Sequence, residues 1–187
     1  MTIRLGLYGG TFDPIHNGHL HLITELLTRE VVDEIVVVPA GNPWMRESAP
    51  TASAEDRLMM VELGVTEIPM ELRTRISVSD TEVKRSGPTY TIDTVEELKK
   101  SRPDASIILI VGSDASLNIA KWHRSSELLA QVELLVIARD GDGLDIDALA
   151  VSSSRIREEI ELRIDVTQEI PESIWTYIQE RNLYASK

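Results

Sequence analysis

The stretch that most constrains this chain is residues 9–19, with the sequence GGTFDPIHNGH. The apolar run Ile3 to Tyr8 precedes it and predicts a first strand. Apolar residues at helical spacing follow it, namely Leu20, Leu22, Ile23, Leu26 and Leu27. Strand, glycine turn and helix, in this order, build phosphate sites at the carboxyl edge of a parallel sheet. The stretch therefore predicts an α/β fold with a ligand site at its first turn.

The residue types within this stretch suit a phosphate. Gly9 and Gly10 allow backbone amides to approach a ligand because no Cβ stands in the way. His16 and His19 are three residues apart, so both can face the helix N-terminus, where free N–H groups and the helix dipole favour an anion. The spacing indicates phosphate chemistry.

Two other interpretations of these histidines are open. They could cap the helix or pack against it, or an H-x-x-H pair could bind a metal ion. A metal site needs further ligands. These are scarce, because the chain has no Cys and only four His, at positions 16, 19, 21 and 123. We therefore expect no resident metal site.

The composition fits one globular domain. The chain has 187 residues, of which 42% are hydrophobic and 27% charged, which is enough for a proper core. The lack of cysteine excludes disulfides and thiolate metal sites and is compatible with a reducing compartment. No run reaches the length of a membrane span, and residues 1–10 predict a strand instead of a signal peptide. The sequence thus predicts a cytoplasmic protein with no membrane partner.

The net charge of −12 comes from 31 acidic and 19 basic residues. This balance opposes non-specific binding of nucleic acid, which depends on Lys and Arg neutralising phosphates. A site for anionic substrates must then be locally positive. The side chains available for it are His16, His19, Arg46, Arg139, Arg155 and Arg157.

Four more runs predict strands: Glu34–Pro39, Arg75–Val83, Ser106–Val111 and Glu133–Ala138. Helices are expected between and after them. Their predicted starts are a Ser53–Asp56 capping box, residues 89–94, a serine cap at 125 or 126, the hydroxyl-rich residues 151–157, and Pro171. Residues 40–52 and 140–143 predict loops, and Gly64 is a candidate helix end.

Strands that alternate with helices over this length predict a Rossmann-like, doubly wound parallel sheet of about five or six strands, with helices on both faces. We expect residues 1–187 to form a single domain. A helical C-terminal portion, at about 151–187, is expected to pack on it.

The stretch GGTFDPIHNGH resembles the H-x-G-H signature of the nucleotidylyltransferase superfamily, in the form found in bacterial nicotinate mononucleotide adenylyltransferases. The resemblance implies transfer of AMP from ATP to nicotinate mononucleotide, giving nicotinate adenine dinucleotide and pyrophosphate. It also implies that His16 and His19 are catalytic. The ATP-binding residues that it implies in this stretch are Gly9, Gly10, Thr11, Phe12, His16 and His19.

Two later segments resemble the family's mononucleotide site. Residues 87–94, GPTYTIDT, are similar to the segment that lines the pyridine-nucleotide pocket, which implies that Thr89, Tyr90 and Thr91 bind substrate. By itself this segment predicts only a capped helix start. Trp122, followed by a histidine, resembles the tryptophan that stacks on the nicotinate ring. An aromatic ring with a polar handle suits a flat heterocycle, and core packing is the alternative.

Two others resemble ATP-binding segments. Residues 112–114, GSD, are similar to the family's G-[AS]-D, which implies that Gly112 and Asp114 hold the ribose and adenine of ATP. Helix capping is the other role open to Asp114. Residues 153–157, SSRIR, resemble the S-S-T-x-I-R that closes over the triphosphate. The anion contacts implied there come from Ser153, Ser154 and Arg157.

The second loop departs from the family's usual pattern. Many members carry N-x-P-P-H-K, with the Lys at the phosphates, whereas residues 41–46 are GNPWMR. This form is similar to the G-Q-P-W-x-K variant of actinobacterial-type members, with Arg46 in the Lys position. Arg keeps the charge but replaces a point donor with a planar fork. The resemblance implies a catalytic and substrate-binding role for Arg46, and the alternative is an exposed loop arginine.

The implied reaction fits the residues present. A nucleotide phosphate is already an ionised nucleophile, so neither a general base nor a covalent intermediate is required. Mg²⁺ would travel with ATP, held by few protein ligands. The alternatives are transfer to nicotinamide mononucleotide or phosphopantetheine, cytidylyl transfer, and a nucleotide-binding sensor without catalysis. The sequence is also compatible with a homo-oligomer.

Overall fold

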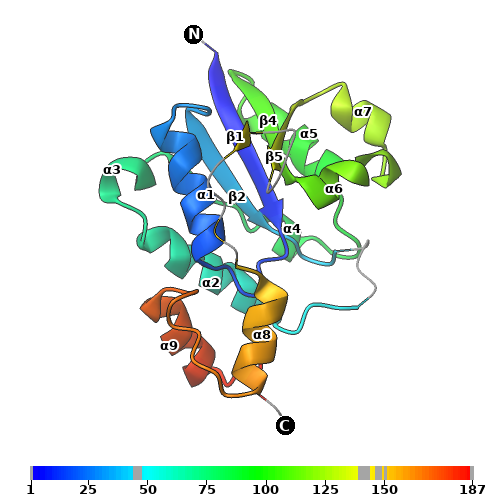
Figure 1. Ribbon diagram of the computed structural model, residues 1–187. Helices are drawn as coiled ribbons and strands as arrows, with labels where there is room; N and C mark the ends of the chain where they lie inside the picture. The colour runs from blue at the N-terminus through cyan, green and yellow to red at the C-terminus, as the bar shows by residue number, and fades with distance from the viewer. Residues whose placement is uncertain (1, 44–47, 139–143, 146–148, 150, 186–187) are drawn as a thin grey trace.

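Two adjacent strands, β1 (Ile3–Gly10) and β4 (Ala105–Gly112), form the centre of the sheet in the computed structural model (Figure 1). Their middle residues are apolar and buried, as is usual for strands covered on both faces. The register aligns Leu7 with Val36 on one side and with Leu109 on the other. The structure describes residues 2–43, 48–138, 144–145, 149 and 151–185.

Within these residues the sheet has six strands in the order β3-β2-β1-β4-β5-β6, and every neighbouring pair is parallel. The other strands are β2 (Glu34–Pro39), β3 (Ile76–Val78), β5 (Glu133–Ala138) and β6 (Leu144–Asp145). The chain adds strands on one side of β1 first and then crosses to the other side at β4. Doubly wound folds bind their ligands at such a reversal, beyond the carboxyl ends of the strands.

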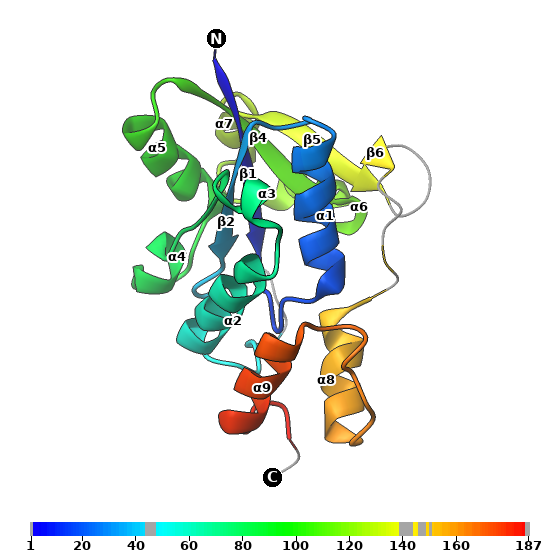
Figure 2. The ribbon, with the colours of Figure 1, turned by 90° about the vertical axis from the view of Figure 1, so that its left-hand side faces the viewer.

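The helices cover both faces of this sheet, and Figure 2 shows α1 and α5 on opposite sides of it. The longer helices are α1 (Asn17–Thr28), α2 (Ala54–Thr66), α5 (Thr91–Ser101), α8 (Ser153–Glu161) and α9 (Glu172–Glu180). The shorter ones are α3 (Met70–Arg73), α4 (Thr81–Lys84), α6 (Ser113–Leu117), α7 (Ser125–Leu129) and the 3₁₀ turn η1 (Ile119–Lys121). The predicted α/β architecture is confirmed.

Each face of the sheet has its own apolar core. The first core lies on the side of α1 and includes Ile15, Ile23, Ile35, Met60 and Ile110. The second lies on the side of α5 and includes Leu7, Val36, Ile92, Val95 and Leu109. Neighbouring residues of one strand alternate between the two cores, because successive side chains of a strand point to opposite faces.

The C-terminal helices belong to the first core. Ile156 and Ile160 of α8, and Ile174 and Ile178 of α9, are buried in the same cluster as the apolar face of α1. Gly64 lets α9 approach α2 closely, since a Cβ at this position would lie 3.3 Å from Ile174 Cδ1. Figure 2 shows α8 and α9 beyond the carboxyl ends of the strands, with α9 beside α2.

The prediction of a strand over Arg75–Val83 was wrong in its second half. Only Ile76–Val78 pairs with β2, and Thr81–Lys84 forms helix α4. The backbone N–H of Lys84 donates to the carbonyl oxygen of Asp80, and Glu82 is buried. A buried carboxyl with partners in the interior favours a helical turn here over continued pairing at the sheet edge.

Two helix boundaries also differ from the prediction. Helix α2 continues through Gly64 to Thr66, because this glycine serves close packing and not a helix end. The N-cap residue of α7 is Arg124, with a φ of 51°, and neither predicted serine takes that place. The hydroxyl of Ser125 donates instead to the carbonyl oxygen of Ala120.

Other boundaries are confirmed. Ser53 caps α2 as predicted, because its Oγ accepts from the backbone N–H of Asp56, but it then donates to Asp56 Oδ2, which replaces the second backbone bond of a full capping box. Pro171 is the N-cap residue of α9. The loop predicted at 140–143 lies outside the described residues. Of the helices that the structure describes, none is both long and apolar enough to cross a bilayer.

Candidate active site

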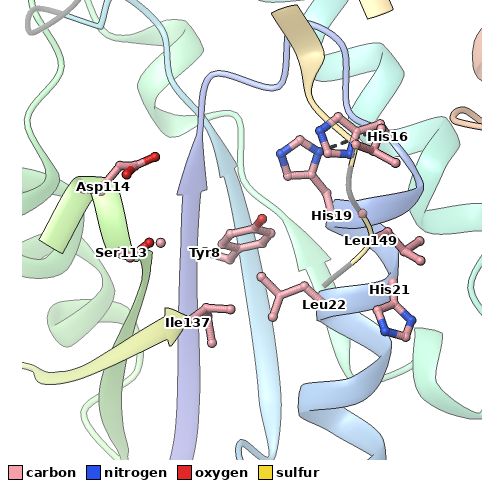
Figure 3. Close-up of a pocket in the computed structure, with 13 residues that line it drawn as sticks. Tyr8, His16, His19, His21, Leu22, Ser113, Asp114, Ile137 and Leu149 are labelled. Carbon is pink, nitrogen blue, oxygen red and sulfur yellow. Dashed lines mark hydrogen bonds between the residues drawn. The ribbon is translucent and has the colours of Figure 1, made fainter. Parts of the chain in front are cut away.

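A cavity of about 230 Å³ lies at the reversal of strand order, beyond the carboxyl ends of β1 and β4 (Figure 3). Its walls come from the end of β1, the first two turns of α1, the start of α6, the end of β5 and the approach to α8. The residues that line it are Tyr8, His16, Gly18, His19, His21, Leu22, Gly112, Ser113, Asp114, Ala115, Ile137, Leu149 and Val151. The structure thus brings the first motif and the GSD motif together.

The two histidines form a capping box at the start of α1. His16 is the N-cap residue, and its backbone N–H donates to His19 Nδ1 at 3.2 Å. The rings stack with centroids 3.7 Å apart and planes at 26°. Because Nδ1 of His19 accepts this bond, the proton of its neutral ring is assigned to Nε2. His19 therefore offers an Nε2–H donor at a helix N-terminus.

The glycine turn folds Phe12 back beneath the histidines. Phe12 has a φ of 51° and is buried, and its ring meets the edge of His19 at a centroid distance of 5.1 Å. A Cβ on Gly10 would lie 2.8 Å from the Phe12 ring, whereas one on Gly9 would point into open space among the described residues. The Phe12 side chain is thus part of the core, which leaves its backbone as the part that can meet a ligand.

The carboxylate of Asp13 holds this turn in place. It is 1% exposed. It accepts hydrogen bonds from the backbone N–H of Thr51 at 2.8 Å, from that of Ala52 at 3.1 Å and from the hydroxyl of Tyr184 at 2.8 Å. The guanidinium of Arg157 donates to the Asp13 carbonyl oxygen at 2.7 Å. The first turn, the second loop and the C-terminal segment therefore meet at one residue.

Burial and the neighbouring Asp13 raise the pKa of Tyr184, so its hydroxyl stays protonated and able to donate at any ordinary pH. Arg57 supports the same region from α2. It is fully buried, and its guanidinium donates to the carbonyl oxygens of Thr11 at 2.7 Å, Gly41 at 3.0 Å and Ala52 at 3.4 Å. Three separate backbone segments are thus joined by one positive side chain.

The start of α8 touches the first turn but faces a different hollow. Ser152 caps the helix by accepting from the N–H of Arg155, and the Ser153 hydroxyl donates to the Pro14 carbonyl oxygen at 2.9 Å. Ser154 and Arg157 line a separate hollow of about 260 Å³, together with Thr51, Glu158, Glu161 and Tyr184. Of Ser152, Ser153 and Ser154, only Ser152 caps the helix, and Ser154 and Arg157 do not line the cavity beside His16 and His19.

The GSD motif stands across the cavity from the histidines. Gly112 ends β4, and Ser113 and Asp114 form the first turn of α6. Figure 3 shows Asp114 on the side of the cavity opposite His16 and His19. The N-cap residue of α6 is Gly112, so Asp114 lies within the helix and not at its cap.

The residues predicted for the mononucleotide lie outside this cavity lining and group around the start of α5. Thr89 is buried, and its N–H donates to the Asn42 carbonyl oxygen at 3.2 Å. Tyr90 stacks on His123 with centroids 4.1 Å apart, and Trp122 packs half-buried against the second core. Arg46 lies outside the described residues.

Arg124 holds the Trp122–His123 turn against α5. Its guanidinium donates to Glu96 of α5 at 2.7 Å and to Glu127 of α7 at 2.7 Å. The Glu127 and Glu96 carboxylates raise the pKa of Arg124, so it is charged throughout the accessible range. Thr91 directly follows Tyr90 in the sequence and is the first residue of α5.

Sequence reasoning missed several residues of the site. Tyr8, His21 and Ile137 line the cavity, and Asp13 and Arg57 hold its turn without lining it. The position of Tyr8 near the end of β1 is a signal that could have been used. Arg57 gives no such signal, because its partners are backbone carbonyls far away in sequence.

Residues 7–159 match the protein family described as Cytidylyltransferase-like. The chain therefore belongs to this family of nucleotidyltransferases. Over nearly its whole length it is also similar to proteins named probable nicotinate-nucleotide adenylyltransferase. The one from Acidothermus cellulolyticus is 36% identical, over 97% of this chain and 94% of that protein. The one from Streptomyces coelicolor is 35% identical, over 94% of this chain and 98% of that protein.

The same fold occurs in a solved structure of the Plasmodium falciparum nicotinic acid mononucleotide adenylyltransferase complexed with NaAD. The two chains superimpose with a TM-score of 0.81 over 97% of each, at 22% sequence identity. A likeness at this identity concerns the fold, and it agrees with the parallel order of the sheet described above.

The contact between Tyr184 and Asp13 can be tested by stability. Tyr184→Phe should lower the free energy of unfolding by about 1–3 kcal/mol, because a buried carboxylate loses one of its donors. Denaturant unfolding followed by circular dichroism measures it. Tyr177→Phe is the matched control, since its hydroxyl donates to Asp56 at 2.8 Å in a part-buried place where water can replace it. Equal losses in the two variants would contradict the anchoring role of Asp13.

Proposed function

We propose that the chain transfers AMP from ATP to nicotinate mononucleotide, giving nicotinate adenine dinucleotide and pyrophosphate. The observation that carries this proposal is the pair His16 and His19 at the start of α1, across a cavity from Asp114, at the reversal of strand order. The names of relatives that are 36% and 35% identical along nearly the whole chain support the choice of substrates.

The chemistry is a direct displacement. An oxygen of the mononucleotide phosphate attacks the α-phosphorus of ATP and forms the new P–O bond. The bond between the α-phosphorus and the bridging oxygen to the β-phosphate breaks, and its electron pair leaves with pyrophosphate. The attacking phosphate is already ionised, so no side chain needs to remove a proton, and catalysis comes from alignment and charge stabilisation.

His16 and His19 are proposed as the catalytic donors to the α-phosphate and the leaving group. The assigned Nε2–H of His19 and the position of both histidines at the N-terminus of α1 support this role. Further ATP contacts are proposed from Gly9, Gly10, Thr11, the Phe12 backbone, Gly112, Asp114, Ser153, Ser154 and Arg157. For Ser154 and Arg157 this requires the phosphates to extend toward the hollow beside α8, which these residues line.

The mononucleotide is proposed to bind beside the start of α5. Thr89, Tyr90 and Thr91 would contact it, and Trp122 would stack on its ring. The support is their common location around the stacked pair of Tyr90 and His123, next to the chain that leads toward Arg46. Arg46 is proposed to supply positive charge to the phosphates of both substrates.

Mg²⁺ is the cofactor that we expect to accompany ATP. Mg²⁺ keeps several waters and commonly reaches such sites through substrate phosphates, where it neutralises developing charge. Among the described residues there is no group of three or more His, Cys, Asp or Glu side chains placed to hold a metal ion. Asp114 is the carboxylate that lines the cavity and would lie nearest to a metal bound by ATP.

The remaining predictions concern organisation. We propose that residues 1–187 act as one domain, with the C-terminal helices as part of it, because α8 and α9 share the first core with α1. A cytoplasmic location, no nucleic-acid partner and a possible homo-oligomer remain predictions from the sequence alone.

One assay tests the function and its alternatives together. Pyrophosphate release from ATP would be measured with nicotinate mononucleotide, nicotinamide mononucleotide and phosphopantetheine side by side. We expect release with nicotinate mononucleotide to be fastest. Faster release with another acceptor would reassign the substrate. Calorimetric binding of ATP without any release would favour a nucleotide-binding sensor.

The two histidines give the first kinetic prediction. His16→Ala and His19→Ala should each lower kcat about a hundredfold or more, because loss of one donor from a preorganised anion site costs roughly 2.7–4 kcal/mol of barrier. The melting temperature should change far less than the rate. Near wild-type turnover in both variants would show that the active site lies elsewhere.

Arg46 gives the second kinetic prediction. Arg46→Lys should retain most activity because the charge is kept, whereas Arg46→Ala should raise the KM for ATP and lower kcat. Steady-state kinetics with each substrate varied in turn measures both. Unchanged kinetics in the alanine variant would make Arg46 an exposed loop residue.

Trp122 gives the third kinetic prediction. Stacking of a base on an aromatic side chain is worth roughly 1–3 kcal/mol, and a pyridine ring, being small, should lie in the lower half of that range. Trp122→Ala should therefore slow the reaction with both mononucleotides, keep their ratio, and leave ATP binding nearly intact. Direct titration of ATP, together with the kinetics, decides whether Trp122 lies in the mononucleotide pocket or in the ATP pocket. Weakened ATP affinity with a normal mononucleotide KM would place the indole in the ATP pocket.

A further inference from the structure

Glu82 is a buried carboxyl that lines neither the cavity beside the histidines nor the hollow beside α8. It lies in α4, in the segment where a strand was expected, and it is 8% exposed. Burying a carboxyl is costly unless its oxygens accept hydrogen bonds. A buried carboxyl in a one-turn helix must therefore have hydrogen-bond donors beside it.

The partners of Glu82 belong to the segment proposed to bind the mononucleotide. The hydroxyl of Thr94 donates to Glu82 Oε1 at 2.8 Å, and Thr94 is itself buried. Thr89 stands close by, since a Cβ on Gly41 would meet both the Glu82 carbonyl oxygen and Thr89 Cγ2, and Thr89 lowers the pKa of the Glu82 carboxyl. These threonines stand on either side of the point where α5 begins. The carboxylate thus fixes both the last loop residues before α5 and its first turn.

The backbone of Glu82 reaches the second loop as well. A Cβ on Gly41 would lie 2.0 Å from the Glu82 carbonyl oxygen, so α4 and this loop are in direct contact. The Thr89 hydroxyl lies 3.3 Å from the carbonyl oxygen of Asn42, and Pro43 forms a bridge with Thr89. Glu82 therefore lies where the second loop and the start of α5 meet.

Charge around Glu82 is sparse. Burial raises the pKa of the Glu82 carboxyl, while hydrogen bonds from Thr94 and Thr89 and the charge of Arg85 act in the opposite direction. Arg85 is itself engaged, because its guanidinium donates to Glu97 at 2.8 Å. The Thr94 hydroxyl therefore holds the Glu82 carboxylate directly, whereas the nearby Thr89 hydroxyl donates to the Asn42 carbonyl oxygen of the second loop.

From this arrangement we infer that Glu82 is a positioning residue for the acceptor mononucleotide. By holding Thr94 in the first turn of α5 and packing beside Thr89, it sets the geometry of residues 89–91, without touching the substrate itself. The inference rests on the function proposed above. It assigns Glu82 to the acceptor half of the site, so its removal should affect the acceptor and spare ATP.

Steady-state kinetics of the full-length chain, with each substrate varied in turn, tests this assignment. Glu82→Ala should raise the KM for nicotinate mononucleotide about tenfold or more, with kcat lowered less than about threefold and the KM for ATP within about twofold. Glu82→Gln keeps an acceptor oxygen and should raise the mononucleotide KM only about threefold. Thr94→Val, which removes the hydroxyl but keeps the shape, should change the same parameter in the same direction.

Glu97→Ala is the matched control. It removes a half-exposed carboxylate of α5 that pairs with Arg85, and every parameter should stay within about twofold. Calorimetric titrations of ATP and of the mononucleotide provide a second readout that does not depend on turnover. Both should show the same split as the KM values.

Two outcomes would overturn the inference: an unchanged mononucleotide KM in Glu82→Ala and Thr94→Val, or a parallel rise of both KM values together with a lower melting temperature. The second would mean a purely structural role. A failure of the proposed function is distinct, because it would appear in the unsubstituted chain as no pyrophosphate release. If Glu82→Ala does not fold, the glutamine and valine variants decide.

Discussion

The rest of the structure depends on the buried carboxylate of Asp13. A carboxylate that is 1% exposed is destabilising unless its oxygens are fully hydrogen-bonded, and here the second loop and the C-terminal tyrosine supply the donors. Because these donors come from residues 51, 52 and 184, the turn is stable only when distant parts of the chain are in place. This first turn also fixes His16, three residues after Asp13, at the start of α1. The geometry of the histidine pair proposed as catalytic is thus tied to complete folding of the chain, not to local propensity.

The parts of the fold that could be predicted are those governed by local pattern. Strands β1 and β4 are nearly continuous apolar runs, and the Ser53–Asp56 box marks a helix start through bonds between near neighbours. The prediction of one strand over 75–83 was wrong in its second half, because alternation predicts a continuous strand, whereas Glu82 turns inward to meet Thr94, twelve residues further along. Gly64 was misjudged for a similar reason, since its role is contact with Ile174 of α9. Both errors concern contacts that no local window contains.

The candidate site divides in the same way. His16, His19 and Asp114 could be predicted because each belongs to a motif at the carboxyl end of a strand, and the structure brings them to one cavity. Arg57 could not, because its guanidinium serves backbone carbonyls of three segments and no motif surrounds it. The stack of Tyr90 on His123 was also beyond the sequence, since it depends on how Arg124 holds the turn before α7 against α5. Sequence motifs thus identify the residues proposed for the chemistry, whereas the side chains that hold those residues in place come from distant parts of the chain.

The division of the molecule into two cores has a consequence for how such a chain can diverge. The histidine pair rests on α1, which packs into the first core, while the start of α5 and Trp122 rest on the second. The sheet lies between the two cores, so substitutions beneath α5 can accumulate without disturbing the packing beneath α1. Under the proposed function, the preference for the acceptor can therefore drift under selection while the half of the site proposed for the adenylyl donor stays constant. A scaffold arranged in this way can acquire new acceptors over evolutionary time by remodelling one side only.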